Sequence, residues 1–395
     1  MTETPEMPLY MRRTGFDPVE ELAQVRDTKG VIQVQSVSGA TAYLVTRYED
    51  VRRVLADAAV FSSARPALAG LTDVGTRTGE RDGMLIFYDP PEHTRLRKML
   101  SGEFTGRRMR RLEPRITEIV AGALDDLERA GSPADLVSLF ALPVPLLVIC
   151  ELLGVPYADR DSFQDRVGRI VDATLSREQR DTALLESRAY MRELVVRARA
   201  EPGEDMLGML VREHGDDLAD GELAGVADLL LIAGHETTAN MLSLGTLALL
   251  RNPDQLASVR DDPSRTEAAV EELLRWLSIV SSLSPRMTTA AVEIAGQVIP
   301  EGALVIPALS AANRDRSCIE DPDTLDVTRG ATGHVALGHG VHHCLGAPLA
   351  RMEMRIAFPA LLRRFPGLAL ACPDDEVEFR AHSLVFGLKS LPVTW

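Results

Sequence analysis

One cysteine of this chain stands in a setting that favours chemistry. Three glycines surround Cys344, at Gly338, Gly340 and Gly346. A helix is predicted directly after them, over 347–365. Glycine lets a backbone approach a flat ligand closely, and N–H groups at the start of a helix stabilise a thiolate. The spacing therefore favours a loop that presents its sulfur as an axial ligand.

Two other interpretations of this loop stay open at this point. A buried cysteine in a turn can be purely structural. The histidines His339, His342 and His343 could join Cys344 around a zinc ion, although adjacent residues rarely converge on a tetrahedron. A dinucleotide-binding loop is excluded, because His343 stands where the last glycine of that motif is needed.

A second cluster lies on the longest predicted helix, which runs from Asp220 as the N-cap to Leu250. Its segment 233–238, Ala-Gly-His-Glu-Thr-Thr, sets an acid and two hydroxyls in an apolar run. Burying such groups costs free energy unless they have partners, so we expect them to border water or a ligand. A packed helix with a satisfied polar pair is the alternative. The HExxH zinc motif is absent, because Ala239 takes the place of its second histidine.

A third cluster is the pair Glu272 and Arg275 on a helix predicted over 265–279. A spacing of three residues places both side chains on one helix face, which suits a local ion pair. Taken alone, this pair is typical of a solvated surface.

Composition limits the classes of partner. The chain has 395 residues, of which 45% are hydrophobic and 26% charged, and a formal net charge of −15. This charge disfavours nucleic acid and anionic lipid as partners. Charged residues interrupt any signal peptide or membrane anchor near the start, at Glu3, Glu6, Arg12, Arg13 and Asp17. We therefore expect a cytoplasmic protein that binds neither nucleic acid nor membrane.

The elements that position these clusters are predicted to be mainly helical, with small β-sheets. No repeat or linker divides the chain, so a single domain over 1–395 is expected. The four cysteines are far apart, which argues against disulfides or a zinc ribbon: Cys150, Cys318, Cys344 and Cys372. The patterns predict a hairpin over 31–37 and 41–46, further helices over 90–99 and 114–128, strands over 292–294 and 298–300, and short strands in the last 25 residues.

The clusters together resemble one known family. The cysteine segment is similar to the haem-binding signature of the cytochrome P450 family, Phe-x-x-Gly-x-His/Arg-x-Cys-x-Gly. It matches at Gly340, His342, Cys344 and Gly346, whereas Leu337 replaces the phenylalanine. The helix segment 233–238 is similar, at every position, to the family's oxygen-activation motif Ala-Gly-x-Asp/Glu-Thr. The resemblance spans at least 89–351.

The resemblance implies a helix-rich triangular prism around a buried haem b, iron protoporphyrin IX. Cys344 would be the iron ligand, with Leu337, Gly338 and Gly346 in the loop around it. The haem propionates would be bound by four basic side chains, His93, Arg97, Arg286 and His342. Because Leu337 lacks the usual aromatic ring, we hypothesise altered haem retention or redox potential.

The pair Glu272 and Arg275 matches the family's Glu-x-x-Arg motif, which is buried and tied to a later arginine. Arg329 is the matching position in this chain, and its implied role is structural. Leu325 is a second position where the family often has phenylalanine.

The implied activity is oxygen insertion with electrons from a separate ferredoxin and ferredoxin reductase. Thr237 would hold the activated oxygen by a hydrogen bond and Glu236 would relay protons to it, beside Ala233 and Gly234. The basic run 107–111, close after Lys98, would help dock an acidic electron carrier, or is simply a solvated face. A haem-thiolate sensor or electron carrier that does not oxygenate is the alternative class.

The family pattern also predicts where substrate binds. The expected substrate pocket has mostly apolar side chains, at Leu85, Ile86, Leu175, Ile232, Val280, Leu283, Leu384 and Val385. Such a lining suits a bulky, weakly polar small molecule such as a macrolide, another polyketide, a steroid or a terpenoid.

Overall fold

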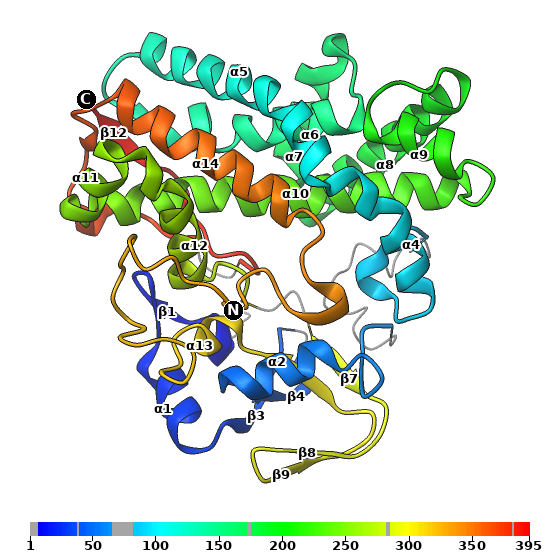
Figure 1. The fold of residues 1–395 in the computed structure, drawn as a ribbon, viewed down its shortest axis with the longest axis vertical. Coiled ribbons are helices and arrows are strands. Elements are labelled where there is room, and N and C mark those ends of the chain that lie inside the picture. Colours follow the sequence, from blue (N-terminus) through cyan, green and yellow to red (C-terminus); the bar gives the residue numbers. More distant parts are fainter. Residues whose placement is uncertain (1–6, 38, 65–81, 172–174, 282–284, 381–382) are drawn as a thin grey trace.

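The computed structural model describes residues 7–37, 39–64, 82–171, 175–281, 285–380 and 383–395. Helices make up one large part of the molecule, and small sheets gather with a few helices in the other (Figure 1). Leu283 of the predicted pocket lies outside the described residues. The prediction of a mainly α fold with small β-sheets is confirmed.

The largest sheet has five strands in the order β3-β4-β10-β7-β5. The strands β3 (Val31–Gln35) and β4 (Thr41–Val45) form the predicted hairpin, with Val31 opposite Val45. Strand β10 (Leu304–Pro307) runs parallel to β4 and buries all four of its residues. The other two strands are β7 (Arg286–Thr288) and β5 (Phe61–Ser62). Arg286 is therefore fixed at a strand end inside the molecule.

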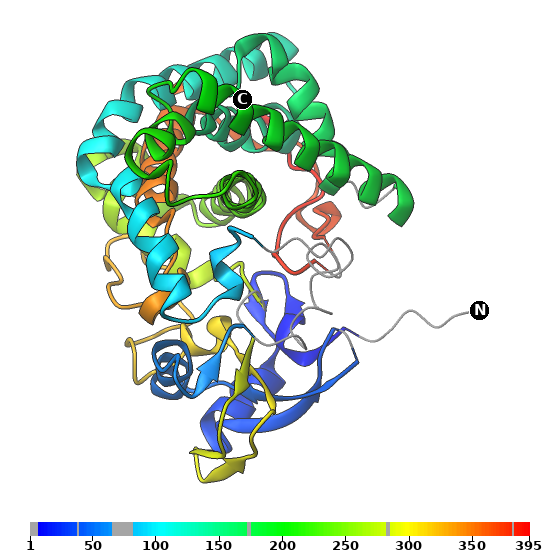
Figure 2. The same ribbon diagram turned by 90° about the vertical axis from the view of Figure 1, so that its right-hand side faces the viewer.

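The helix α10 (Asp220–Leu250) runs through the middle of the helical part. Figure 2 looks nearly along it and shows other helices above it and on its left, with the C-terminal part of the chain, in red, on its right. It packs against α6 (Pro143–Leu153), α8 (Arg177–Ala200) and α14 (Ala347–Arg364). Residues 239–249 are all buried, which explains why this stretch carries no charge and is mostly apolar.

Two predicted helix starts are wrong. Asp220 is the first helical residue rather than the N-cap, which is Ala219, and the carboxylate of Glu222 accepts the Ala219 N–H at 3.1 Å. Helix α5 (Gly106–Ala130) begins eight residues before Pro114. Pro114 has no N–H to donate to the carbonyl of Arg110, one turn earlier in the helix. Because both residues are exposed, water can donate a hydrogen bond to that carbonyl instead.

The other predicted helices agree closely. Helix α4 (Glu92–Ser101) and helix α12 (Thr266–Leu277) occupy the predicted positions. Helix α12 ends because Ser278 adopts a left-handed conformation, with φ of +40°. The rest of the helices are α1 (Glu20–Thr28), α2 (Tyr48–Ala56), α7 (Arg160–Val171), α9 (Met206–His214), α11 (Pro253–Asp261) and α13 (Leu309–Ala312).

The remaining strands are short. They are β1 (Arg13–Thr14), β2 (Asp17–Pro18), β6 (Ala134–Asp135), β8 (Val292–Ile294), β9 (Gln297–Ile299), β11 (Ala369–Leu370) and β12 (Pro392–Thr394). The predicted pair over 292–300 is confirmed with its second strand shifted by one residue. Strand β12 confirms a strand near the end of the chain. Within the described ranges, no helix combines the length and apolar character needed to cross a membrane.

Candidate functional site

The cysteine loop is a tight turn closed by its own backbone. The N–H of Cys344 donates to the carbonyl of Leu337 at 2.8 Å. Gly338 and Gly340 adopt φ of +75° and +70°, which favours glycine at both positions. A Cβ at position 340 would lie 2.6 Å from the carbonyl oxygen of Leu55 in α2. The glycines are therefore needed for the turn itself and for its close approach to α2.

The sulfur of Cys344 lies at the start of α14. Burial raises the pKa of this thiol, while the N–H groups of Gly346 and Ala347 and the guanidinium groups of Arg97 and Arg351 oppose that rise. A thiolate here would have two N–H donors and two cations near it. Coordination to a metal ion deprotonates such a thiol outright, so this position suits an iron–sulfur bond.

Four basic side chains predicted to bind propionates come together in the structure. His93 is 1% exposed, and neither of its ring nitrogens has a partner among the described residues. Its ring centroid lies 4.2 Å from that of His342. Arg286 is buried and donates to the carbonyl of its neighbour Pro285 at 3.1 Å, and Arg97 is half-buried.

This group is short of negative charge. Burial lowers the pKa of Arg286 to about 10, and burial together with Arg286, His93 and Arg97 lowers the pKa of His342 to about 3. The nearby carboxylate of Asp89 is hydrogen-bonded to Ser62 and Ser63. Buried cations need anionic partners, so the group fits a ligand that brings carboxylates, as haem does.

The segment 233–238 begins at a stretch of α10 where two consecutive residues, Ile232 and Ala233, are exposed, which among the described residues of this helix is otherwise seen only at its start, at Asp220 and Gly221. Gly234 packs closely against α6, since a Cβ there would lie 2.7 Å from Cδ1 of Ile149, whose side chain would have to shift. The hydroxyl of Thr237 donates to the carbonyl of Ala233 at 2.7 Å. The structure thus places this hydroxyl beside an open face of an otherwise buried helix.

The two ionisable residues of the segment have different surroundings. His235 is 4% exposed, its ring donates to the carbonyl of Leu142, and burial lowers its pKa to about 4. Glu236 is half-buried, and its Oε1 lies 2.9 Å from Nη2 of Arg380. His235 is therefore a neutral packing residue, whereas Glu236 keeps contact with solvent.

The structure brings together the three residues of the predicted Glu-x-x-Arg network. Glu272 and Arg275 are fully buried and share two hydrogen bonds of 2.7 Å. Nε of Arg329 lies 3.7 Å from the same carboxylate. Leu325, the second leucine at a usual phenylalanine position, is buried in the main core. The pair is thus a core feature and not a solvated one.

The described members of the predicted substrate pocket differ in exposure. Ile86 and Ile232 are exposed, at 43% and 41%, whereas Leu85 and Val385 are buried. Leu175, Val280 and Leu384 are half-buried. Val280 and Val385 form an antiparallel bridge, so the structure brings these two together from segments far apart in sequence.

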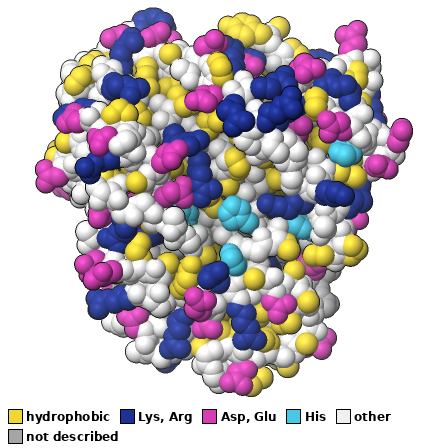
Figure 3. Space-filling model, viewed as in Figure 1, with side chains coloured by type: hydrophobic (Ala, Val, Ile, Leu, Met, Phe, Trp, Pro, Cys, Tyr) yellow, Lys and Arg dark blue, Asp and Glu magenta, His cyan; other side chains and the backbone are white. Residues whose placement is uncertain are grey.

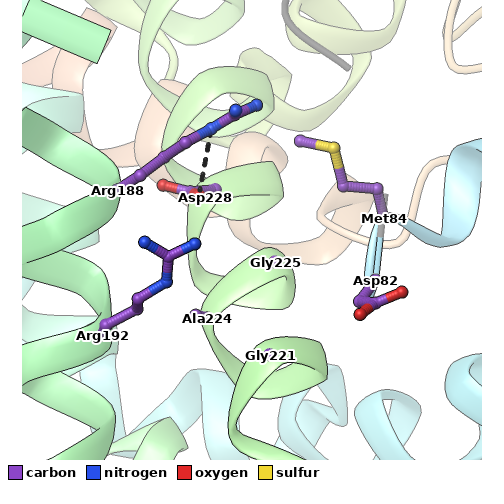
Figure 4. Close-up of a pocket in the computed structure, with 8 residues that line it drawn as sticks. All are labelled: Asp82, Met84, Arg188, Arg192, Gly221, Ala224, Gly225 and Asp228. Atoms are coloured by element: carbon purple, nitrogen blue, oxygen red, sulfur yellow. Dashed lines mark ion pairs between the residues drawn. The ribbon is translucent and has the colours of Figure 1, made fainter. Parts of the chain in front are cut away.

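Sequence reasoning missed a polar cavity of about 240 Å³ between α8 and α10. Figure 4 shows Arg188 and Arg192 extending from α8 toward Asp228 on α10. Nε of Arg188 lies 3.7 Å from Oδ2 of Asp228, and both side chains are buried. The cavity is lined by Asp82, Met84, Arg188, Arg192, Gly221, Ala224, Gly225 and Asp228. The available signal was Asp228, a carboxylate directly before the apolar run of the helix.

Two ionic contacts near the site were also missed. Arg380 meets Glu236, as described above. Glu271 receives two bonds from Arg351, of 2.6 and 2.8 Å, and one from His334 at 3.2 Å. No local spacing predicts either contact, because each joins segments far apart in sequence.

The zinc interpretation of the cysteine loop is wrong. Among the described residues, which include the whole loop, no three His, Cys, Asp or Glu side chains converge as metal ligands.

Comparison with known proteins decides the family. Cytochrome P450 FAS1 of Rhodococcoides fascians is 53% identical over 400 residues, covering 100% of both chains. The chain belongs to the cytochrome P450 family. A family model described as Cytochrome P450 matches residues 203–395 of this P450. The solved structure of P450 StaH from glycopeptide antibiotic biosynthesis is 44% identical with a TM-score of 0.90, covering 99% of this chain and 100% of that chain.

Other relatives bear on the activity. Pentalenic acid synthase of Streptomyces avermitilis is 43% identical over 97% of this chain and 96% of its own length. Nocardicin C N-oxygenase of Nocardia uniformis subsp. tsuyamanensis is 43% identical over 94% of each. This P450 is a haem-thiolate monooxygenase, as predicted, and its cofactor is haem b. The relatives favour this class over a non-oxygenating sensor.

Proposed function

We propose that this P450 inserts one oxygen atom of O₂ into a bulky, mostly apolar secondary metabolite, by hydroxylation or epoxidation. The observation that carries the proposal is the open face of α10 at Ile232 and Ala233, beside the hydroxyl of Thr237. Apolar side chains from distant segments are predicted around this face. A macrolide or other polyketide, a steroid and a terpenoid are the substrate classes that such a lining suits.

Each residue of the candidate site would have its own role in binding haem or handling protons. Cys344 would hold the haem iron, and the group of His93, Arg97, Arg286 and His342 would hold its propionates. The bound haem supplies the activation of O₂. Thr237 would donate a hydrogen bond on the side of the haem where O₂ reacts. To do so, its hydroxyl would have to give up its present bond to the Ala233 carbonyl.

Glu236 would move protons between solvent and this hydroxyl. Its half-buried carboxylate reaches solvent while standing next to Thr237 in sequence. Proton transfer by a carboxylate needs such access on one side and a hydrogen-bonding partner on the other.

We also infer that the substrate carries a polar group at one end. Gly221, Gly225, Asp228 and Ile232 follow one another at helical spacing, so they share one face of α10. Asp228 therefore precedes Ile232 by one helical turn, about 6 Å. The cavity of Arg188 and Asp228 therefore lies one turn before the exposed Ile232, and its paired charges suit a hydroxyl or amide.

A matched pair of probes tests this polar end. Dodecan-1-ol should bind about tenfold more tightly than dodecane, measured by the haem spin shift, since a satisfied polar contact contributes roughly 1 kcal/mol or more. The double variant Arg188→Met/Asp228→Leu removes both charges together and should abolish the preference. Equal affinity of the two probes for the unaltered protein would exclude a polar end.

Electrons would come from a ferredoxin and its reductase. Figure 3 shows Lys and Arg side chains spread over the face that carries the cysteine loop. Lys98, Arg107 and Arg110 are exposed there, whereas Arg108 and Arg111 are paired with Glu103 and Glu204. The exposed cations would attract an acidic carrier. The cytoplasmic location and the single domain over 1–395 stay predictions.

Difference spectroscopy of the reduced protein with carbon monoxide tests the haem assignment. Thiolate ligation by Cys344 should give the red-shifted Soret band of the family, and Cys344→Ser should lose it. Cys318→Ser, a half-buried cysteine away from the loop, should leave the band unchanged. A Soret band typical of histidine ligation in the unaltered protein would refute the assignment. A spin-shift screen of polyketides, steroids and terpenoids then identifies the substrate class.

A further inference from the structure

Arg380 connects the C-terminal part of the chain to the predicted oxygen-activating segment of α10. Its Nη2 atom donates to Oε1 of Glu236 and to Oδ1 of Asn240, both at 2.9 Å. Glu236 and Asn240 are four residues apart and therefore neighbours on one helix face. One guanidinium nitrogen thus holds two side chains of α10, and one of them adjoins Thr237 in sequence.

The backbone around this contact is shaped to admit it. A Cβ at Gly387 would lie 2.1 Å from Oδ1 of Asn240 and 3.0 Å from Nη2 of Arg380, so a larger residue could not stand there. The N–H of Arg380 donates to the carbonyl of Gly387 at 2.8 Å. Asn240 is 5% exposed, which removes water as a competitor for its side-chain oxygen. The contact is therefore a packed feature and not a chance surface pair.

The same stretch of chain reaches the predicted substrate pocket. Phe379 and Leu388 form an antiparallel bridge, and we call the two described segments that meet there, 379–380 and 383–388, the hairpin. On this hairpin, Val385 bridges to Val280, and the carbonyl of Leu384 accepts the N–H of Ser281 at 3.3 Å. Leu384, Val385 and Val280 are three of the residues predicted to contact substrate.

We propose that Arg380 is a positioning residue that couples the substrate-contacting hairpin to the orientation of the Glu236 carboxylate. This inference rests on the proposed proton relay through Glu236. A guanidinium has no proton to give at neutral pH, so Arg380 orients the carboxylate and does not carry the proton. Oε1 is held by Arg380, and Oε2 has no hydrogen bond from another described residue, so it is the oxygen that exchanges protons.

Through this coupling, substrate binding would change the position of the Glu236 carboxylate. A molecule that presses on Leu384 and Val385 displaces the hairpin, and the displacement reaches Glu236 through Arg380. Because coupling between two sites is reciprocal, changing Glu236 must also change the stability of the hairpin. This reciprocity is measurable without any substrate.

Amide hydrogen exchange of the haem-loaded protein tests the coupling directly. The reporter is the N–H of Phe386, which donates to the carbonyl of Ile279 at 2.8 Å on the hairpin. Arg380→Gln and Glu236→Gln should each speed its exchange about tenfold, because each removes the same charge-assisted contact. The double variant should exchange no faster than either single variant. Unchanged exchange in Arg380→Gln, or additive effects in the double variant, would overturn the proposal.

Lys389→Gln is the matched control. Lys389 directly follows the hairpin, and its Nζ lies 2.6 Å from Oε2 of Glu378, with both side chains exposed. Its loss removes an ion pair beside the hairpin without touching Glu236. Exchange at Phe386 should stay within about twofold of the unaltered protein. An increase as large as that of Arg380→Gln would show general loosening and would also overturn the proposal.

A second measurement separates this inference from the proposed function. NADPH consumption and hydrogen peroxide release are followed with a plant-type ferredoxin and its reductase, without substrate. Glu236→Gln should raise the peroxide released per NADPH about threefold, and Arg380→Gln should do the same but add nothing in the Glu236→Gln background. Arg380→Lys, which keeps a cation, should recover part of the loss.

The outcomes of this measurement differ for the two ideas. If Glu236→Gln leaves the peroxide yield unchanged, the proton relay through Glu236 is wrong, while the exchange experiment still decides the coupling. If Glu236→Gln raises the yield and Arg380→Gln does not, Arg380 has no positioning role and the inference fails.

Discussion

Arg275 donates from Nε and Nη2 to the two carboxylate oxygens of Glu272, at 2.7 Å each, and neither side chain has exposed surface. Nη1 of Arg275 reaches the carbonyls of Asn313 and Pro322, at 2.9 and 2.7 Å. The carboxylate also accepts the N–H of Asp326 at 3.0 Å. This pair therefore fixes helix α12 to the irregular chain that leads toward the cysteine loop.

Glu272→Gln should destabilise the protein strongly. Removing one partner of a buried ion pair leaves an uncompensated charge, at a cost of about 3–5 kcal/mol. We expect a lower melting temperature and a lower haem content in the purified protein. The control is Glu267→Gln on the same helix, which removes an exposed pair with Arg355 and should cost less than about 1 kcal/mol. Equal melting temperatures for the two variants would contradict the assignment.

Thr237→Ala should separate substrate binding from oxygen insertion. Alanine lacks the hydroxyl and the γ-methyl group and adds no atom that could obstruct the pocket, so the spin shift and the affinity for substrate should be retained. Product formed per NADPH should fall about tenfold or more, with peroxide released instead, because the hydrogen-bond donor is lost. Thr246→Ala is the control, since its hydroxyl makes the same 2.7 Å bond to the carbonyl four residues earlier, at Leu242. Unchanged coupling in Thr237→Ala would refute the role.

His235 should make the protein less stable in acid. Burial lowers its pKa to about 4 from the ordinary 6.5, so the folded chain binds fewer protons than the unfolded chain between these two values. Stability contributed by the neutral ring is complete above 6.5 and is lost as the pH falls toward 4, by about 3 kcal/mol in all.

The variant His235→Asn isolates this contribution. Asparagine keeps an N–H donor for the Leu142 carbonyl but does not titrate. Between about pH 7 and pH 5, the melting temperature of the unaltered protein should fall by several degrees more than that of the variant. Parallel curves for the two proteins would show that folding does not lower the pKa of His235.

Leu337→Phe tests whether the missing aromatic ring matters. Leu337 is half-buried against the main core, and its carbonyl accepts the N–H of Cys344 at 2.8 Å. A ring at this position would change the apolar shell around the sulfur, which sets how readily a thiolate-bound iron is reduced. We expect a shifted midpoint potential and slower haem loss. Identical values in both proteins would leave Leu337 without an effect on the cofactor.

The sequence predicted best what short spacing determines. The cysteine loop, the segment 233–238 and the pair Glu272 and Arg275 are each contained in fewer than a dozen residues, so chemical type and spacing mark them as candidates. The resemblance to the P450 family then chose among the interpretations that spacing left open. The contact of Arg380 with Glu236 joins positions 144 residues apart, and only the packing of the C-terminal hairpin brings them together.

Errors in the predicted elements have local physical causes. A proline usually marks the beginning of a helix, yet Pro114 stands inside α5. This is tolerated because the Arg110 carbonyl, which receives no hydrogen bond from the proline, is exposed to water. The polar cavity was missed for a different reason. The partner of Asp228 is Arg188 on another helix, 40 residues earlier in the chain, so no local spacing could reveal the pair.

The close approach of Gly340 to Leu55 has a consequence for engineering. A Cβ at position 340 would lie only 2.6 Å from that carbonyl oxygen. The shape of the loop that carries Cys344 therefore depends on its contact with the end of α2, nearly 300 residues earlier in the chain. Chimaeras that exchange the first sixty or so residues with those of a relative would replace one side of this contact. Such chimaeras should incorporate haem only when the donor segment reproduces the backbone path at Leu55 and Ala56.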